Sequence, residues 1–290
     1  MPRPIIASLA ALVLFWATAF AADVDLRLPT QPEREVKLPG RGAFTGARLY
    51  APEGAGPFPG AVLSHTCGPL RQNIFEWAQR FLVAGYVVLV VDHLGPRGVR
   101  SNCWPSFSVS VTEYAQDAIA AMRHLRSMTF VDGKRIVLMG FSYGAMAGLR
   151  ASSKSFREKS LGGEGFAAIV SLYPWCNQQG GPSYQDHQWN FYDDTTTPLL
   201  VLLGADDDDA DPRSCIDKAK VNAAKGMPVE YKVFPGTTHA FDNSLLADKP
   251  FVFQQGGHTV TYRYNRESVD EAWRLTLDFL GRHVAGSERR

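Results

Sequence analysis

The chain has 290 residues, of which 45% are hydrophobic and 20% are charged. This is enough apolar material for the core of one α/β domain. Lys and Arg together number 30 and Asp and Glu 29, and this balance excludes the strongly basic surface that nucleic-acid partners require.

The N-terminus has the pattern of a secretory signal peptide. An almost continuous apolar run ends at Phe20, and small residues follow at Ala21 and Ala22. The run is shorter than the roughly 20 apolar residues of a membrane span, so cleavage is expected rather than an uncleaved anchor. We therefore expect residues 1–21 to be removed and residues 22–290 to form one periplasmic or secreted domain without membrane contact.

The mature chain begins with strand patterns. Short alternating segments at 35–38 and 47–50 favour antiparallel edge strands. Compact apolar runs then predict strands that are buried on both faces. These runs cover residues 60–65, 86–93, 135–142, 166–174, 199–204 and 229–235.

Helical segments with recognisable ends separate these strands. Ser110 and Glu113 form a capping box at the start of one helix. Asp211 and Pro212 place a capping carboxylate before a proline at the first helical position. The last helix is expected at about 266–284.

Strand and helix alternate to the end of the chain. This order predicts an α/β fold with a mostly parallel central sheet and helices on both faces. The connection 240–265 is rich in glycine and aromatic residues. We expect it to be a loop or a small excursion at the rim of the site rather than a second domain.

The motif with the clearest chemistry is Gly-x-Ser-x-Gly at 140–144, between a predicted strand and a helix of small residues. Gly140 and Gly144 allow a sharp turn that presents the Ser142 hydroxyl at its apex. The N-terminus of the following helix supplies N–H groups near a developing oxyanion. The alternative is a glycine-rich turn with a solvent-facing serine.

An acidic loop and a histidine follow Ser142 in the order serine, acid, histidine. The run 206–209 consists of four aspartates after the strand 199–204, and His239 comes after the strand 229–235. A histidine activates a serine hydroxyl as a base, and a carboxylate orients the histidine. The alternatives are a solvated acidic loop or a calcium site, although the glycine and glutamate of a calcium loop are missing.

The chain resembles the dienelactone hydrolase family of α/β-hydrolases through the segment 140–144, the Gly-x-x-Asp that begins at Gly204 and the segment 235–241, Pro-Gly-Thr-Thr-His-Ala-Phe. The resemblance covers nearly the whole mature chain. It implies an α/β-hydrolase catalytic domain, with Asp207 as the acid and Asp208 as the second choice.

The chain departs from the family prototypes at two positions. The prototypes carry a cysteine nucleophile and a glutamate on the loop after the third strand, whereas this chain has Ser142 and His65. Because of these two differences, the resemblance does not imply dienelactone as the substrate. It still implies acyl transfer as the reaction.

In such folds the loop after the third strand supplies one oxyanion donor. The backbone N–H of Cys67 or Thr66 is therefore expected to act together with that of Tyr143. The alternative role for Cys67, as a nucleophile, lacks the strand–turn–helix setting.

Several residues are candidates for substrate contacts. Arg97 and Arg100 lie just past a predicted strand, where they could bind a substrate carboxylate or form a loop salt bridge. Aromatic side chains are candidate walls of an apolar pocket or members of the core; they are Trp104, Tyr143, Trp175 and Phe241.

The four cysteines have neither C-x-x-C nor zinc-type spacing. In an oxidising compartment they permit two disulfides, whereas four reduced thiols are expected in the cytoplasm. We favour Cys67 with Cys103 and Cys176 with Cys215, because each pair joins loops from strands expected to be neighbours.

These features predict a serine hydrolase that cleaves a carboxylic ester or lactone through an acyl-enzyme on Ser142, without a metal or other cofactor. The partner implied is a small-molecule ester or lactone. The alternatives are a deacetylase of acetylated sugars and an exported binding protein that has the fold without catalysis.

Overall fold

The computed structural model describes residues 34–39, 44–103, 106–176 and 193–284. The predicted signal segment lies outside these residues. Within the described part of the chain, no helix is both long enough and apolar enough to cross a membrane.

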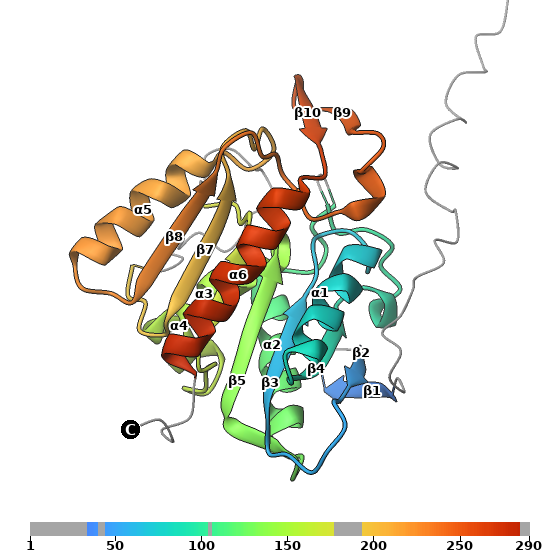
Figure 1. Ribbon diagram of the computed structural model, residues 1–290, viewed down its shortest axis with the longest axis vertical. Helices are drawn as coiled ribbons and strands as arrows, with labels where there is room; N and C mark the ends of the chain where they lie inside the picture. Colours follow the sequence, from blue (N-terminus) through green and yellow to red (C-terminus); the bar gives the residue numbers. More distant parts are fainter. Residues whose placement is uncertain (1–33, 40–43, 104–105, 177–192, 285–290) are drawn as a thin grey trace, which may run out of the picture.

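A single eight-stranded sheet forms the centre of the molecule (Figure 1). Its order is β1-β2-β4-β3-β5-β6-β7-β8, with parallel pairing from β4 to β8 and antiparallel pairing at the β1–β2 edge. The mostly parallel sheet and its antiparallel edge are as predicted. The strands are β1 (Arg34–Pro39), β2 (Phe44–Tyr50), β3 (Phe58–Ser64), β4 (Val87–Asp92), β5 (Val131–Phe141), β6 (Ile169–Leu172), β7 (Leu199–Gly204) and β8 (Val229–Phe234).

Helices cover both faces of the sheet, and each face has its own apolar core. α1 and α6 pack on one face through Trp77 and Phe279, and α2, α3 and α5 pack on the other through Tyr114, Met146 and Cys215. The helices are α1 (Gln72–Val83), α2 (Val111–Arg126), α3 (Tyr143–Ser152), α4 (Lys154–Ser160), α5 (Pro212–Ala224) and α6 (Arg266–His283), with short 3₁₀ turns at η1 (Gly95–Arg97) and η2 (Ser244–Leu246).

The predicted helix starts are present. Ser110 and Glu113 form a complete capping box at α2, because each side chain bonds the other's backbone N–H. Asp211 accepts from Arg213 N at the start of α5. Such contacts satisfy N–H groups that have no partner inside the helix.

The connection 240–265, expected to be a loop or a small excursion, contains a two-stranded hairpin. β9 (Phe251–Gln255) pairs antiparallel with β10 (His258–Tyr262). Gly256 and Gly257 join them with φ of 58° and 86°. Two glycines with positive φ make a tight hairpin turn. The hairpin projects beyond the carboxyl ends of β7 and β8 (Figure 1).

Candidate active site

Three of the predicted site residues lie on loops at the carboxyl ends of parallel strands of the central sheet. Ser142 follows β5, Asp207 follows β7 and His239 follows β8. Because parallel strands end at the same edge of the sheet, residues far apart in the sequence are brought together there.

Ser142 lies at a strained turn between β5 and α3. Its φ is 50° and its ψ is −110°, a conformation that few non-glycine residues adopt. A Cβ on Gly140 would lie 2.3 Å from the backbone oxygen of Gly144, and one on Gly144 would lie 2.1 Å from the backbone oxygen of Ser64. Both glycines of the motif are therefore required by close backbone approach. The turn leaves Ser142 partly exposed.

A chain of hydrogen bonds links the three side chains. His239 Nε2 lies 3.0 Å from Ser142 Oγ, and His239 Nδ1 lies 2.8 Å from Asp207 Oδ2. Asp207 Oδ1 accepts from the backbone N–H groups of Asp209 and Ala210, at 3.1 and 2.7 Å. These two bonds hold the carboxylate in place, so that its other oxygen faces the imidazole.

The remaining aspartates of the acidic loop have other partners. Asp208 accepts from Thr261 N at 3.1 Å. Asp209 accepts from Gln255 Nε2 at 2.7 Å and from the Tyr262 hydroxyl. These contacts attach the loop to the β9–β10 hairpin. Of the four aspartates, Asp207 is the one whose carboxylate bonds to His239 Nδ1.

The loops after β7 and β8 are packed backbone to backbone. Ala205 N donates to Phe234 O and Asp206 N donates to Thr237 O, both at 2.9 Å. A Cβ on Gly204 would lie 2.3 Å from Thr237 O. This packing fixes the acidic loop against the segment that carries the histidine.

The electrostatic environment of His239 favours its protonated form. Burial lowers the pKa, but the charge and hydrogen bond of Asp207, together with the charges of Asp209 and Asp242, outweigh it and raise the pKa to about 9. Asp209 Oδ2 lies 3.8 Å from His239 Nε2. A negative charge therefore lies near each ring nitrogen.

A buried support that was not predicted from the sequence lies behind the imidazole. The Tyr173 ring, 4.7 Å from that of His239, meets it edge-on. The Tyr173 hydroxyl donates to Asp242, which also accepts from Asn73 and Trp77. The available signal was an acidic residue, Asp242, three positions after the histidine and next to the aromatic Phe241.

A pH profile tests this environment. If neutral His239 is the form that accepts a proton, kcat/KM for an ester is expected to rise with pH and level off above about pH 9. Asp209→Asn removes one carboxylate that raises the pKa, so the rising limb should move to lower pH. Asp208→Asn is the matched control. An unmoved limb in Asp209→Asn would contradict this account of the pKa.

The loop after β3, expected to carry an oxyanion donor, lies against the nucleophile turn. The Ser64 and His65 carbonyl oxygens would be 2.1 and 2.6 Å from a Cβ on Gly144. Cys67 O accepts from Asn102 N at 2.8 Å. The loops 64–68 and 101–103 are therefore joined next to the start of α3.

Both disulfides have the expected pairing, Cys67 with Cys103 and Cys176 with Cys215. The first joins the loop after β3 to the one that follows η1, and the second joins the segment after β6 to α5. The bonded residues are 36 and 39 positions apart. Bridges of this span restrict the unfolded chain by about 3–4 kcal/mol each in the entropy model.

We expect the two disulfides to differ in their effect on activity. Replacing Cys67 and Cys103 together with Ser should lower both the free energy of unfolding and kcat, because it releases the loop beside Ser142. The Cys176→Ser, Cys215→Ser pair should lower mainly stability. Urea unfolding and ester kinetics measure these effects, after peptide mapping without reductant. Four alkylatable thiols in the protein from an oxidising compartment would contradict the pairing.

The expectation that Arg97 binds a substrate carboxylate is wrong. Its guanidinium donates to both oxygens of Asp117, at 2.8 and 2.9 Å, and to His93 O at 2.7 Å. Asp117 is fully buried, and a buried carboxylate requires a partner of this kind. Arg97 therefore forms the loop salt bridge that was the alternative, whereas Arg100 is exposed and stays a prediction.

Two of the four candidate pocket walls belong to the core. Phe241 is fully buried against Tyr173 and Phe234. The Tyr143 side chain is 4% exposed, and its hydroxyl donates to Val109 O. Both side chains fill space beneath the site and do not form the wall of a substrate pocket. Trp175 packs half-buried against an apolar core and stays a prediction, and Trp104 lies outside the described residues.

Comparisons with known proteins agree with this fold. The chain is 26% identical over 150 residues to the quorum-quenching protein AidA of Acinetobacter baumannii, a match that spans 51% of this chain and 45% of that protein. The structure is similar to the dienelactone hydrolase-like promiscuous phosphotriesterase from metagenomic libraries (TM-score 0.63, 17% identity, 87% of this chain and 98% of that one). It is also similar to a thermophilic esterase, esterase 2 of Thermogutta terrifontis (TM-score 0.62, 17% identity, 91% and 99%).

These structural likenesses show the α/β-hydrolase fold. The family is shown by a different finding, a match of residues 45–284 to the model of the dienelactone hydrolase family. The match covers the whole sheet from β3 to β8 and the loops that bear Ser142, Asp207 and His239. The chain belongs to the dienelactone hydrolase family.

Proposed function

We propose that this protein is a serine hydrolase that cleaves a carboxylic ester or lactone. The observation that carries the proposal is the continuous contact from Ser142 Oγ to His239 Nε2 and from His239 Nδ1 to Asp207, at 3.0 and 2.8 Å. A serine hydroxyl is a weak nucleophile, and a histidine base oriented by a carboxylate is the arrangement that activates it.

In the first half-reaction, Ser142 Oγ attacks the carbonyl carbon while His239 Nε2 takes the hydroxyl proton. The tetrahedral intermediate collapses, the bond to the alcohol oxygen breaks, and His239 returns the proton to the departing alcohol. The acyl group is then bonded to Ser142. Asp207 holds the proton on Nδ1 and stabilises the imidazolium that forms at each transfer.

In the second half-reaction, water takes the place of the alcohol. His239 removes a proton from the water, whose oxygen attacks the acyl-enzyme, and the acid leaves as the proton returns to Ser142 Oγ. For a lactone, the alcohol and the acid are two ends of one product. The backbone N–H of Tyr143 and that of Cys67 or Thr66 are the proposed donors to the oxyanion.

The relatives support an acyl-transfer site that also reacts with phosphoryl compounds. Thermogutta esterase 2 is known in a form phosphorylated by paraoxon, and the metagenomic relative is a promiscuous phosphotriesterase. A phosphorylating reagent is therefore a suitable probe for the nucleophile of this chain.

The test combines labelling with turnover. A fluorophosphonate probe should add its phosphonyl mass to the peptide that contains Ser142, and a panel of nitrophenyl esters, lactones and acetylated sugars should include at least one substrate. Preference for acetylated sugars would point to a deacetylase. A protein that is neither labelled nor active on any member would overturn the proposal in favour of an exported binding protein.

We also propose that the protein is exported to the periplasm or the medium. The two disulfides support an oxidising environment. Cell fractionation, with N-terminal sequencing to detect removal of residues 1–21, tests this proposal.

A further inference from the structure

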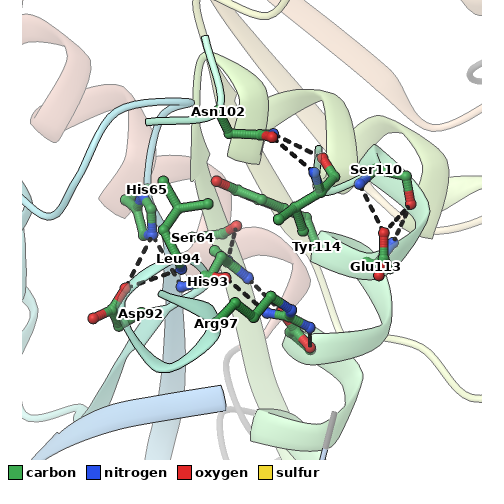
Figure 2. A network of polar contacts seen from close by, with 12 residues as sticks. Ser64, His65, Asp92, His93, Leu94, Arg97, Asn102, Ser110, Glu113 and Tyr114 are labelled. Atoms are coloured by element: carbon green, nitrogen blue, oxygen red, sulfur yellow. Dashed lines mark hydrogen bonds and ion pairs between the residues drawn. The ribbon is translucent and has the colours of Figure 1, made fainter. Parts of the chain in front are cut away.

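A second set of polar side chains lies buried beside the site, and the reaction proposed above does not use it. Ser64 Oγ lies 2.8 Å from His93 Nε2 (Figure 2), and His93 Nδ1 donates to Asp117 Oδ2 at 2.9 Å. Arg97 completes the set through Asp117. Burial opposes the charge on Asp117, but the hydrogen bonds from His93 and Arg97 outweigh it and hold the pKa of Asp117 below its usual value.

This serine–histidine–aspartate set has the contacts of an active site without access to substrate. Ser64, His93 and Asp117 are all fully buried. A buried network with satisfied hydrogen bonds rigidifies the segments that it joins. Here it joins the end of β3, the end of β4 and the middle of α2.

His65 connects this network to the loop expected to carry an oxyanion donor. Its Nε2 accepts from the backbone N–H of His93 at 3.0 Å (Figure 2), and its Nδ1 lies 2.8 Å from Thr66 O. A ring nitrogen that accepts an N–H carries no proton, so in neutral His65 the proton is on Nδ1 and is donated to Thr66 O. Burial, followed by the nearby His93, lowers the pKa of His65 to about 3, which keeps the ring neutral.

The hydrogen bond to Thr66 O determines the direction of the next N–H group. The peptide that joins Thr66 to Cys67 is planar and trans, so its C=O and N–H bonds point in opposite directions. The Tyr114 hydroxyl donates to the same oxygen at 3.3 Å. Two buried donors on one side of this peptide therefore direct the Cys67 N–H to the other side.

We propose that His65 is a positioning residue of the oxyanion hole: its Nδ1–H holds Thr66 O and thereby aims the Cys67 N–H at the substrate oxygen. The inference rests on the proposed function and deepens it, because it selects Cys67 over Thr66 as the donor. An oxyanion donor stabilises charge that develops in the transition state, so its loss lowers kcat rather than substrate affinity.

Two amide variants separate the two bonds of the His65 ring. His65→Asn keeps an N–H near the position of Nδ1 and loses the acceptor for His93 N. His65→Gln places an amide oxygen near the position of Nε2 and loses the donor to Thr66 O. Each variant gives up one buried hydrogen bond, so a purely structural role for His65 predicts similar losses of activity from both.

The positioning role predicts that the two variants lose different amounts of kcat. His65→Gln is expected to lower kcat by about 10- to 100-fold, somewhat less than deletion of an oxyanion donor, with KM nearly unchanged. His65→Asn should retain most of the kcat. A trifluoromethyl ketone that forms a tetrahedral adduct with Ser142 should lose affinity for His65→Gln by the same factor as kcat/KM.

Tyr114→Phe provides a second route if the His65 variants fail to fold. It removes the other donor to Thr66 O and should lower kcat with little change in KM. The control is Thr276→Val, which deletes a buried hydrogen bond within α6, from Thr276 Oγ1 to Ala272 O, and should leave kcat unchanged. Urea unfolding of all variants shows how much each loses in stability.

The outcomes are distinct. Equal kcat losses in His65→Asn and His65→Gln, or unchanged kcat in Tyr114→Phe, would overturn the inference while leaving an active wild-type enzyme. A wild-type protein that neither turns over esters nor reacts with fluorophosphonate would overturn the proposed function, and the inference with it.

Discussion

Replacing Ser142 with alanine is expected to lower kcat for an ester by about a thousandfold or more, the loss typical of a triad nucleophile. The alanine has no group that can form the acyl-enzyme, whereas His239 and Asp207 keep their mutual hydrogen bond. Stability should change little, because the positive φ of 50° at this position strains alanine and serine alike. Steady-state kinetics and urea unfolding measure the two effects.

Labelling provides the matching control. The Ser142→Ala protein should not react with fluorophosphonate and should keep the near-ultraviolet circular dichroism of the wild type. Wild-type esterase activity in this variant would contradict the assignment of the nucleophile.

Asp207→Asn is expected to lower kcat by roughly 10²- to 10⁴-fold. The asparagine can present an N–H to His239 Nδ1, which would leave the proton of the neutral ring on Nε2, where it cannot accept the proton of Ser142. The side chain of Asp207 is almost fully buried and accepts from Asp209 N and Ala210 N. Parallel unfolding measurements are therefore needed to separate loss of activity from loss of stability.

The neighbouring aspartates are the controls for Asp207→Asn. Asp208→Asn should retain most activity, because the Asp208 carboxylate accepts from Thr261 N, whereas Asp207 is the aspartate that bonds to His239 Nδ1. Asp209→Asn should mainly move the pH profile. Equal losses at all three positions would indicate a metal site or general electrostatics in place of a single orienting carboxylate.

Much of the site was predictable from local sequence. The turn at Ser142 requires glycines two positions before and after it, and these requirements act within a few residues, so the motif is visible without tertiary contacts. The order of Ser142, Asp207 and His239 follows from strands that alternate with helices and end at one edge. The choice of Asp207 over Asp208 depended on the family resemblance, and the structure shows the contact that distinguishes them.

Other features depended on contacts between distant segments. The attachment of the hairpin 251–262 is one of them, because its acidic partners Asp208 and Asp209 are about fifty positions earlier in the chain. The hairpin itself has a local signal, because Gly256-Gly257 separates two short runs rich in aromatic and β-branched residues.

The sequence by itself determined the strand–turn–helix at Ser142, the parallel sheet and the edge at which the functional loops meet, because hydrophobic periodicity and glycine geometry are local properties. Only the tertiary structure decided the role of charged and aromatic side chains at that edge. Arg97 could bind substrate or a buried acid, and the fully buried Asp117 on another element settled the matter. The neutral His65 ring carries its proton on Nδ1 because its Nε2 accepts from the backbone N–H of His93. The role of such a polar side chain depends on the partner that completes its hydrogen bonds, and here that partner is distant in sequence.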